Sequence, residues 1–110
     1  MRNSREMMEN EEFVKFLKST LIKIENAINL MNQSKHIPAY NKMLGVQQKL
    51  IDLNKVHRTQ MLSQLITTRS IINCFINGRY EICDTQILKL KQELINICFK
   101  EENNERDKNK

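Results

Sequence analysis

Apolar residues recur at steps of three and four along four stretches of the chain. The clearest stripe lies in the C-terminal half, and its members are Tyr80, Cys83, Ile87, Leu90, Leu94 and Ile97. Such steps keep residues on one side of an α-helix, because the helix completes a turn every 3.6 residues. We therefore predict a helix from about Tyr80 to Lys100. Asp84 could cap a second start within it, which leaves a kink or a split near Cys83 open.

A second stripe lies in the N-terminal part of the chain, with the members Phe13, Leu17, Leu21, Ile24, Ile28 and Met31. Its steps are close to a coiled-coil heptad and predict a helix over residues 9–33. Glu9, Glu11 and Glu12 stand in the first turn of this helix, where negative charge interacts favourably with the helix dipole. Residues 1–8 precede the helix and are expected to be flexible.

A third stripe follows Pro38 and consists of Met43, Val46, Leu50 and Leu53. Proline suits the first turn of a helix, where its missing N–H costs no hydrogen bond, so the pattern predicts a helix over residues 38–55. Gly45 lies in the middle of that helix, at a cost of about 1 kcal/mol relative to alanine. A close crossing with another helix would explain a position without a side chain.

The remaining helix, third in chain order, is predicted between an N-cap at Thr59 and a stop at Asn77-Gly78. Glycine allows the left-handed conformation that ends many helices. Its apolar set is Leu62, Leu65, Ile66, Ile72 and Ile76, with Met61, Ile71 and Phe75 alongside. Arg69 interrupts this stripe and is expected at its edge.

Short connections favour antiparallel neighbours, so the expected fold is all-α: a four-helix up-and-down antiparallel bundle over residues 9–100. Two glycines and one proline are too few for the many turns of a β-sandwich or barrel. Residues 101–110 contain no apolar side chain and are expected to form a disordered charged tail. The long stripe of residues 9–33 leaves open that this helix pairs with a second chain.

No motif for catalysis or ligand binding is recognisable. His36 and His57 have no cysteine, histidine or carboxylate at the spacing of a zinc site. The chain contains no nucleophile elbow, and two glycines cannot build a phosphate-binding loop. We therefore expect no enzyme activity, no metal and no cofactor.

The cysteines bear on the cellular compartment. Cys74, Cys83 and Cys98 are odd in number and lack CxxC spacing, which favours reduced thiols in a cytoplasmic or nuclear protein. No apolar run is long enough for a transmembrane segment. Residues 1–12 contain four glutamates and no apolar run, unlike a secretory signal peptide.

Positive charge is concentrated in the middle of the chain. The net charge is +5, and residues 35–79 hold seven basic side chains against one acidic side chain, Asp52. Lys35, Lys42 and Lys49 recur every seven residues, so the last two could contact successive phosphates. This basic face predicts an acidic protein, a nucleic acid or an anionic membrane surface as partner. Nucleic acid is the weaker expectation, because aromatic side chains are not interleaved with the basic ones.

The predicted helix over residues 9–33 carries more apolar side chains than one stripe needs, and surplus apolar surface is typical of an interface. We expect a non-catalytic helical protein-interaction module, a small subunit or adaptor of an intracellular assembly, with homo- or hetero-oligomers formed through this helix. The alternative is a nucleic-acid-binding module that uses the basic face of residues 35–79. The candidate partner-binding residues are Phe13, Phe16, Leu17, Lys35, Lys42, Lys49 and Arg69.

One short run, Gly78-Arg79-Tyr80-Glu81-Ile82-Cys83, resembles a Gly-x-aromatic-x-x-small turn at the start of a late helix. This turn belongs to the helical C-terminal domain shared by the COPII outer-coat protein and the steroid receptor RNA activator protein. The resemblance covers roughly residues 17–90, with Cys83 in place of the family's alanine and no tryptophan in the chain. It implies a helical interaction domain with a scaffolding or coat-associated role and no catalytic residues.

Overall fold

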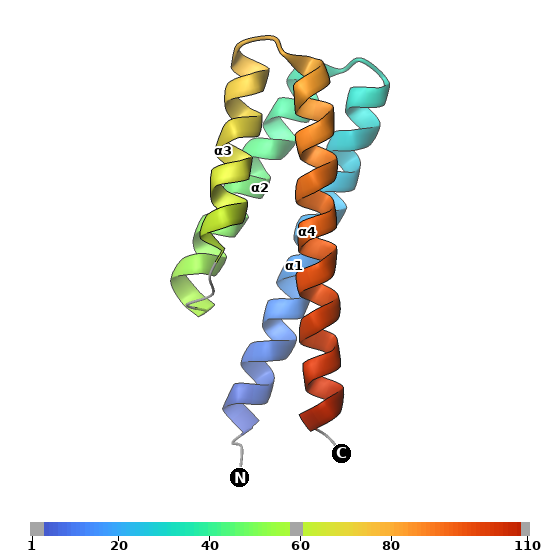
Figure 1. The fold of residues 1–110 in the computed structure, drawn as a ribbon. Helices are drawn as coiled ribbons and strands as arrows, with labels where there is room; N and C mark the ends of the chain where they lie inside the picture. Colours follow the sequence, from blue (N-terminus) through green and yellow to red (C-terminus); the bar gives the residue numbers. More distant parts are fainter. Residues whose placement is uncertain (1–3, 58–60, 109–110) are drawn as a thin grey trace.

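The computed structural model describes residues 4–57 and 61–108 and, within them, the side chains of residues 11–55 and 61–103. It contains four helices, α1 (Ser4–Asn32), α2 (His36–His57), α3 (Leu62–Ile76) and α4 (Tyr80–Lys108) (Figure 1). These described ranges include no strand. The prediction of an all-helical chain is therefore confirmed.

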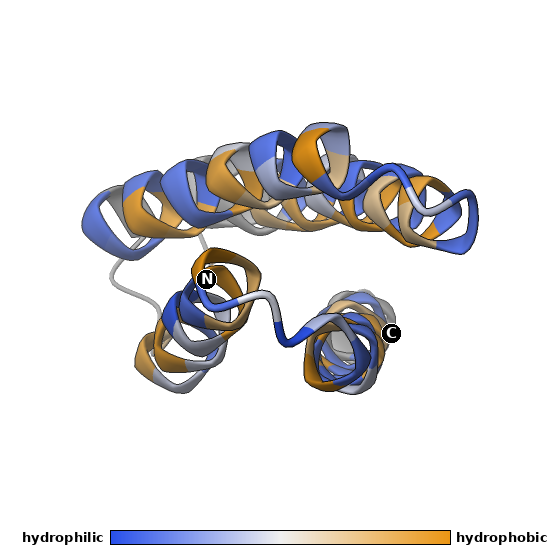
Figure 2. Ribbon diagram, turned by 90° about the horizontal axis from the view of Figure 1, so that it is seen from above, coloured by the Kyte–Doolittle hydropathy of each residue, from blue (hydrophilic) through white to orange (hydrophobic). Residues whose placement is uncertain are grey.

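Each helix packs mainly against two others. α1 contacts α2 and α4, and α3 contacts the same two helices. The α1–α2 and α3–α4 connections lie at one end of the molecule, while the N-terminus of α1 and the C-terminus of α4 lie side by side at the other end (Figure 1). Hydrophobic and hydrophilic segments alternate around the helices (Figure 2), as expected of helices that each bury one side.

Three of the four predicted stripes form the core. The buried members from α1, α2 and α4 are Phe13, Leu17, Ile24, Met31, Met43, Val46, Leu50, Leu53, Cys83, Ile87, Leu90 and Leu94. Leu21, Ile28 and Ile97 are partly buried against them, whereas Tyr80 is 37% exposed. In these three helices the periodicity of the sequence predicted the buried face.

The predicted apolar face of α3 is wrong. Leu62, Ile66 and Ile76 are 64%, 62% and 67% exposed, and Ile72 is the buried member of that set. The residues predicted alongside the set, Met61, Ile71 and Phe75, are buried. The side of α3 that faces the core is a different one from the predicted side. Its members are Met61, Gln64, Thr68, Ile71 and Phe75. The helix thus buries a stripe with two polar residues and leaves its more apolar stripe outside.

Hydrogen bonds satisfy some, but not all, of the polar groups of the buried Gln64 and Thr68 side chains. The Thr68 hydroxyl donates to the backbone oxygen of Gln64 at 2.7 Å. The Gln64 side-chain amide donates to the carboxylate of Glu93 on α4 at 3.5 Å, a long contact. Its own amide oxygen, Oε1, has no hydrogen-bond partner, which is unfavourable for a buried polar atom.

The ends of the outer helices differ from the prediction. α1 begins at Ser4 rather than Glu9, and α4 continues to Lys108 where a disordered tail from residue 101 was expected. Within this extension, the Glu102 carboxylate forms an ion pair with Lys18 of α1 at 2.8 Å. α4 also runs through Cys83 and Asp84 as one helix, without the split that the sequence left open. Residues 109–110 of the expected tail lie outside the described residues.

The turns after α1 and α3 have the same hydrogen-bond pattern. After α3, the Gly78 N–H donates to the Phe75 oxygen and the Arg79 N–H to the Cys74 oxygen, with Gly78 at φ +71°. This is the Schellman pattern, and the predicted left-handed stop at Gly78 is confirmed. After α1, the N–H groups of Ser34 and Lys35 make the equivalent bonds to the oxygens of Met31 and Leu30. Ser34 adopts φ +59°, a conformation that is unfavourable for a residue with a side chain.

The start of α3 and the middle of α2 also correct the sequence analysis. Met61 occupies the N-cap position of α3 without a side-chain cap, and its N–H donates to Asn54 Oδ1 at 3.3 Å. The predicted cap, Thr59, lies outside the described residues. A Cβ atom added at Gly45 would meet nothing within 4 Å, so no close helix crossing requires this glycine.

Candidate partner-binding surface

The apolar residues predicted to bind a partner are used inside the chain. Phe13 and Leu17 are buried in the core. Phe16 is partly buried, and the Lys49 ammonium lies 4.7 Å from the centre of its ring, within range of a cation–π interaction. α1 therefore does not present the expected apolar patch, and Ile22 is its exposed large hydrophobic residue among those described.

The basic residues predicted to bind a partner do not lie on one face. Lys42 lines a shallow hollow with Lys23 of α1, and Lys49 packs on Phe16 of α1. Arg69 lies between α3 and the opposite side of α2. Lys35 is exposed in the turn between α1 and α2. The structure thus divides the basic face of residues 35–79 between two sides of α2.

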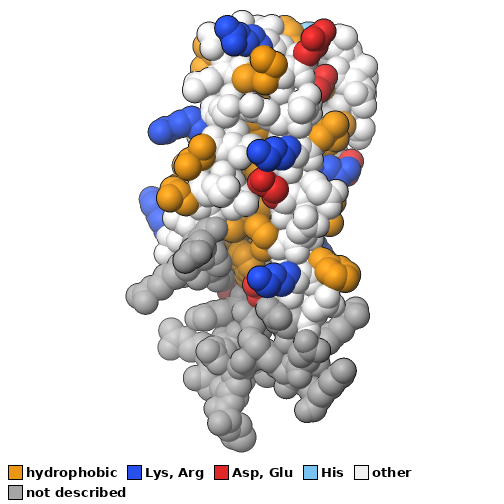
Figure 3. Space-filling model, viewed as in Figure 1, with side chains coloured by type: hydrophobic (Ala, Val, Ile, Leu, Met, Phe, Trp, Pro, Cys, Tyr) orange, Lys and Arg blue, Asp and Glu red, His pale blue; other side chains and the backbone are white. Residues whose placement is uncertain are grey.

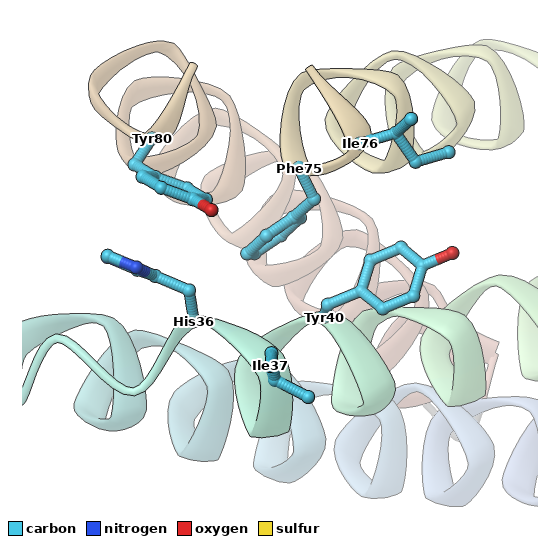
Figure 4. Close-up of a pocket in the computed structure, with 6 residues that line it drawn as sticks. All are labelled: His36, Ile37, Tyr40, Phe75, Ile76 and Tyr80. Atoms are coloured by element: carbon cyan, nitrogen blue, oxygen red, sulfur yellow. The ribbon is translucent and has the colours of Figure 1, made fainter. Parts of the chain in front are cut away.

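A groove between α2 and α3 gathers apolar side chains that the sequence analysis did not assign to an interface. It consists of two hollows and is called here the α2–α3 groove. The first hollow, of about 240 Å³, is lined by His36, Ile37, Tyr40, Phe75, Ile76 and Tyr80 (Figure 4). The second, of about 230 Å³, is lined by Gln47, Ile51, Leu62, Leu65, Ile66 and Arg69.

Aromatic rings give the first hollow fixed walls. His36 stacks on Tyr80 with ring centroids 3.7 Å apart and planes 10° from parallel. Tyr40 meets Phe75 edge-on at 5.8 Å, and Phe75 lies 6.3 Å from Tyr80. In Figure 4 these rings come from facing helices, with Ile37 and Ile76 beside them. Contacts of this kind hold the rings in place without a ligand.

Each wall of the groove is a second stripe with helical spacing. On α2 it consists of Ile37, Tyr40, Leu44, Gln47 and Ile51, and on α3 of Leu62, Leu65, Arg69, Ile72 and Ile76. Both stripes step by 3, 4, 3 and 4, as the core stripes do. This is the signal that could have revealed the groove. It was missed because each helix was credited with only one buried stripe.

The two halves of the chain follow one pattern, offset by 44 residues. Ser34 and Gly78 are 44 residues apart and hold the same place in the two turns. The buried residues of α2 and their counterparts in α4 are Ala39 and Cys83, Met43 and Ile87, Val46 and Leu90, and Leu50 and Leu94. Those of α1 and α3 are Thr20 and Gln64, Ile24 and Thr68, Ala27 and Ile71, and Met31 and Phe75. The α2–α3 groove therefore has a counterpart between α4 and α1.

That counterpart, called here the α1–α4 seam, is closed by charged side chains. Lys91 of α4 forms an ion pair with Glu25 of α1, and Lys18 pairs with Glu102. By the 44-residue offset, Glu25 stands where Arg69 stands in the groove, and Lys91 where Gln47 stands. Arg69 makes no ion pair with any described residue. It is the uncompensated charge of the groove.

Apolar side chains are also exposed along α4. They are Ile82, Leu88, Ile95 and Phe99. Figure 3 shows apolar side chains at the surface over both α3 and α4, with charged groups between them. The charges beside the α4 strip are of both signs, because Lys91 and Glu25 pair at its edge.

The buried thiols are held in their neutral form. Burial raises the pKa of the Cys83 thiol to about 12, and the nearby Cys74 thiol adds to the effect. Burial also raises the pKa of Cys98, while the Glu102 carboxylate raises that of Lys18 through a hydrogen bond and its charge. A thiol reacts as its thiolate, so these environments suit packing. All three cysteines are free.

The described residues hold neither a metal-binding cluster nor a helix suited to span a membrane. They contain no group of three or more histidine, cysteine, aspartate or glutamate side chains that could hold a metal ion. None of the helices, over the same residues, is both long and apolar enough to cross a membrane.

Comparison of the chain with models of protein families, with curated proteins and with solved structures finds no match.

Proposed function

We propose that this chain is a non-catalytic helical module that binds another protein, as a small subunit or adaptor of an intracellular assembly in the cytoplasm or nucleus. In this proposal its helices form an up-and-down antiparallel bundle, in which short turns join neighbours. The observation that carries the proposal is the orientation of α3. This helix leaves Leu62, Ile66 and Ile76 in solvent while it buries Gln64 with an unpaired amide oxygen.

Such an orientation is unfavourable for an isolated chain. Apolar surface exposed to water raises the free energy of the folded state by about 25 cal/mol for each Å². A contiguous exposed apolar surface marks an interaction site more often than single exposed residues do. The two hollows of the α2–α3 groove lie along the same pair of helices, with Ile37 and Tyr80 in one and Leu62 and Ile66 in the other.

The resemblance of residues 78–83 to a family of helical interaction domains supports the same class of function. The groove lining also favours binding over catalysis. It is mostly apolar, whereas a site that stabilises a developing charge needs several polar groups aimed at one point. The proposed interaction surface is the groove, because the stripe of α1 is buried against α2 and α4.

Affinity capture tests the proposal against the nucleic-acid alternative. The tagged full chain is recovered from its own cells at low and at high salt, with and without nuclease. We expect a stoichiometric protein partner that survives both treatments, because apolar contacts do not depend on counterion release. Recovery of nucleic acid that is lost as salt rises would instead support phosphate contacts by residues 35–79. A chain recovered alone under all conditions would contradict both.

A further inference from the structure

We propose that the α2–α3 groove binds an amphipathic helix of an acidic partner, whose apolar stripe packs between the two walls and whose carboxylates meet Arg69 and the lysines beside the groove. This inference rests on the proposed function and adds the conformation and charge of the partner.

The shape of the groove indicates a helix. Both walls are stripes on helices, with steps of three and four residues. A third helix with the same steps can interdigitate with both, as helices do when ridges pack into grooves. α3 has 15 residues, so its wall is about 22 Å long at 1.5 Å per residue. About 15 helical residues of a partner therefore cover it.

The apolar content of the groove indicates an amphipathic helix rather than a purely charged ligand. Ile37 is 76% exposed and has Ile76 beside it in the first hollow, while Leu62 and Ile66 line the second. Leu44 lies between the two hollows on the α2 wall. A single strand of nucleic acid would need aromatic platforms along this length, but the rings are confined to the first hollow.

The charge around the groove indicates that the partner is acidic. Arg69 lines the second hollow, and no carboxylate lines either hollow. Lys55 follows Ile51 by one turn on the same side of α2, and Lys35 and Arg79 are exposed at the other end. α3 has no acidic residue, and α2 has only Asp52, whose carboxylate accepts a hydrogen bond from Gln48.

Comparison with the α1–α4 seam indicates which charge would pair with Arg69 in the groove. There the position of Arg69 is held by Glu25, which has Lys91 as its partner. In the groove, Gln47 stands in place of Lys91 and carries no charge. A carboxylate supplied from outside would complete the pair that the seam contains within the chain. A second copy of this chain is a poor occupant, because two grooves face to face would bring their uncompensated arginines together.

A matched pair of peptides tests the inference on the full chain. One is a capped synthetic helix of about 18 residues with leucines at steps of three and four and glutamates flanking them. The other has lysine in place of every glutamate. Fluorescence anisotropy of each labelled peptide measures binding. We expect the glutamate peptide to bind at least about tenfold more tightly than the lysine peptide.

Matched variants locate the binding. Arg69→Glu should lower the affinity for the glutamate peptide about tenfold and raise the affinity for the lysine peptide, because the sign of the electrostatic interaction reverses. Lys89→Glu makes the same change of charge at an exposed position of α4 and should alter neither. Ile66→Ser should lower the affinity for both peptides. Leu88→Ser, at a similarly exposed apolar position of α4, should leave both affinities unchanged. Circular dichroism checks that each variant keeps its helices, and Arg69→Gln replaces Arg69→Glu if the latter does not.

Several results would overturn the inference. Equal affinity for the two peptides would remove the acidic requirement, and absence of binding at about 100 µM would remove the groove as a helix site. Displacement of the glutamate peptide by a single-stranded oligonucleotide would favour nucleic acid. Displacement of the glutamate peptide by the unlabelled chain, together with a dimer in sedimentation, would favour a second copy of this chain as the occupant of the groove.

The inference and the proposed function fail in different ways. If the affinity-captured partner is retained equally by wild type, Ile66→Ser and Arg69→Glu, the protein-binding function stands and the groove is not its site. If wild type captures no protein, the function itself fails.

Discussion

The α1–α4 seam and the α2–α3 groove occupy equivalent places in the two halves of the chain, but several of their outer side chains differ in kind. At the positions where the groove has Leu62 and Ile76, the seam has Lys18 and Asn32. Where the groove has Ile37 and Tyr40, the seam has Glu81 and Asp84. The packing beneath is alike, since the buried positions correspond at the same offset. The comparison teaches that the core sets the arrangement of helices, while the outer stripes determine which side remains available to a partner.

The largest expected effect is the difference in free energy of unfolding between a core variant and a groove variant. Leu50→Ala on α2 should lower the free energy of unfolding by about 2–5 kcal/mol, because Leu50 is fully buried and its loss leaves a cavity. Leu62→Ala should lower it by less than about 0.5 kcal/mol, because Leu62 is largely exposed. Urea denaturation followed by circular dichroism measures both. Similar losses for the two variants would mean that the outer stripe of α3 is a part of the core.

Gln64→Leu should increase the free energy of unfolding by about 1 kcal/mol. The substitution removes a buried oxygen without a hydrogen-bond partner and costs only a long contact to Glu93. Gln92→Leu, at an exposed site of α4, is the matched control and should have little effect. A destabilised Gln64→Leu variant would show that the amide is better satisfied than its contacts indicate.

The two turns give a similar test at equivalent positions. Ser34→Gly should stabilise the chain by about 1 kcal/mol, because glycine adopts a positive φ without the steric cost of a Cβ atom. Gly78→Ser makes the reverse change in the other half and should destabilise it by a similar amount. Thermal unfolding of the two variants checks the symmetry, which would be contradicted if both shifted the midpoint in the same direction.

The smallest expected effect concerns the charge difference itself. Gln47→Glu places a carboxylate in the hollow that Arg69 lines and should stabilise the chain by no more than about 0.5 kcal/mol, the usual size of a surface ion pair. Its effect on binding should be larger, because Arg69 would then have a partner within the chain. Loss of affinity for the glutamate peptide, measured against Gln92→Glu at an exposed site of α4 as a control, checks this. Unchanged affinity would show that Arg69 does not contact the ligand.

Much of the fold could be predicted from the sequence, because three helices each have one apolar stripe and their ends have local signals. Pro38 falls in the first turn of α2, and Gly78 adopts the predicted left-handed conformation. Ser34 could not be recognised as its equivalent, because serine has no general preference for that conformation. The extension of α4 was missed because residues 101–108 have no apolar stripe, and its ion pair between Glu102 and Lys18 joins residues far apart in sequence.

The candidate surface was less predictable, for a specific reason. α3 has two stripes with helical spacing, and the more apolar one was expected in the core. Hydropathy cannot choose between them when the other stripe contains Thr68, whose hydroxyl is satisfied within its own helix. The choice depends on how α3 meets α2 and α4 together. Phe13 and Leu17 were expected at an interface because the helix over residues 9–33 carries surplus apolar side chains, although the chain uses these two for its own core.

The stacked rings of His36 and Tyr80 bear on the register of the two halves. These are the first residues of α2 and α4, so each ring holds the same place in its half. Stripes with steps of three and four repeat every seven residues, so a slide by seven residues would still match apolar positions with apolar positions. That slide moves a helix by about 10 Å along its axis and would separate the two rings. The stack therefore distinguishes the native alignment from the shifted alignments that the apolar pattern alone would permit.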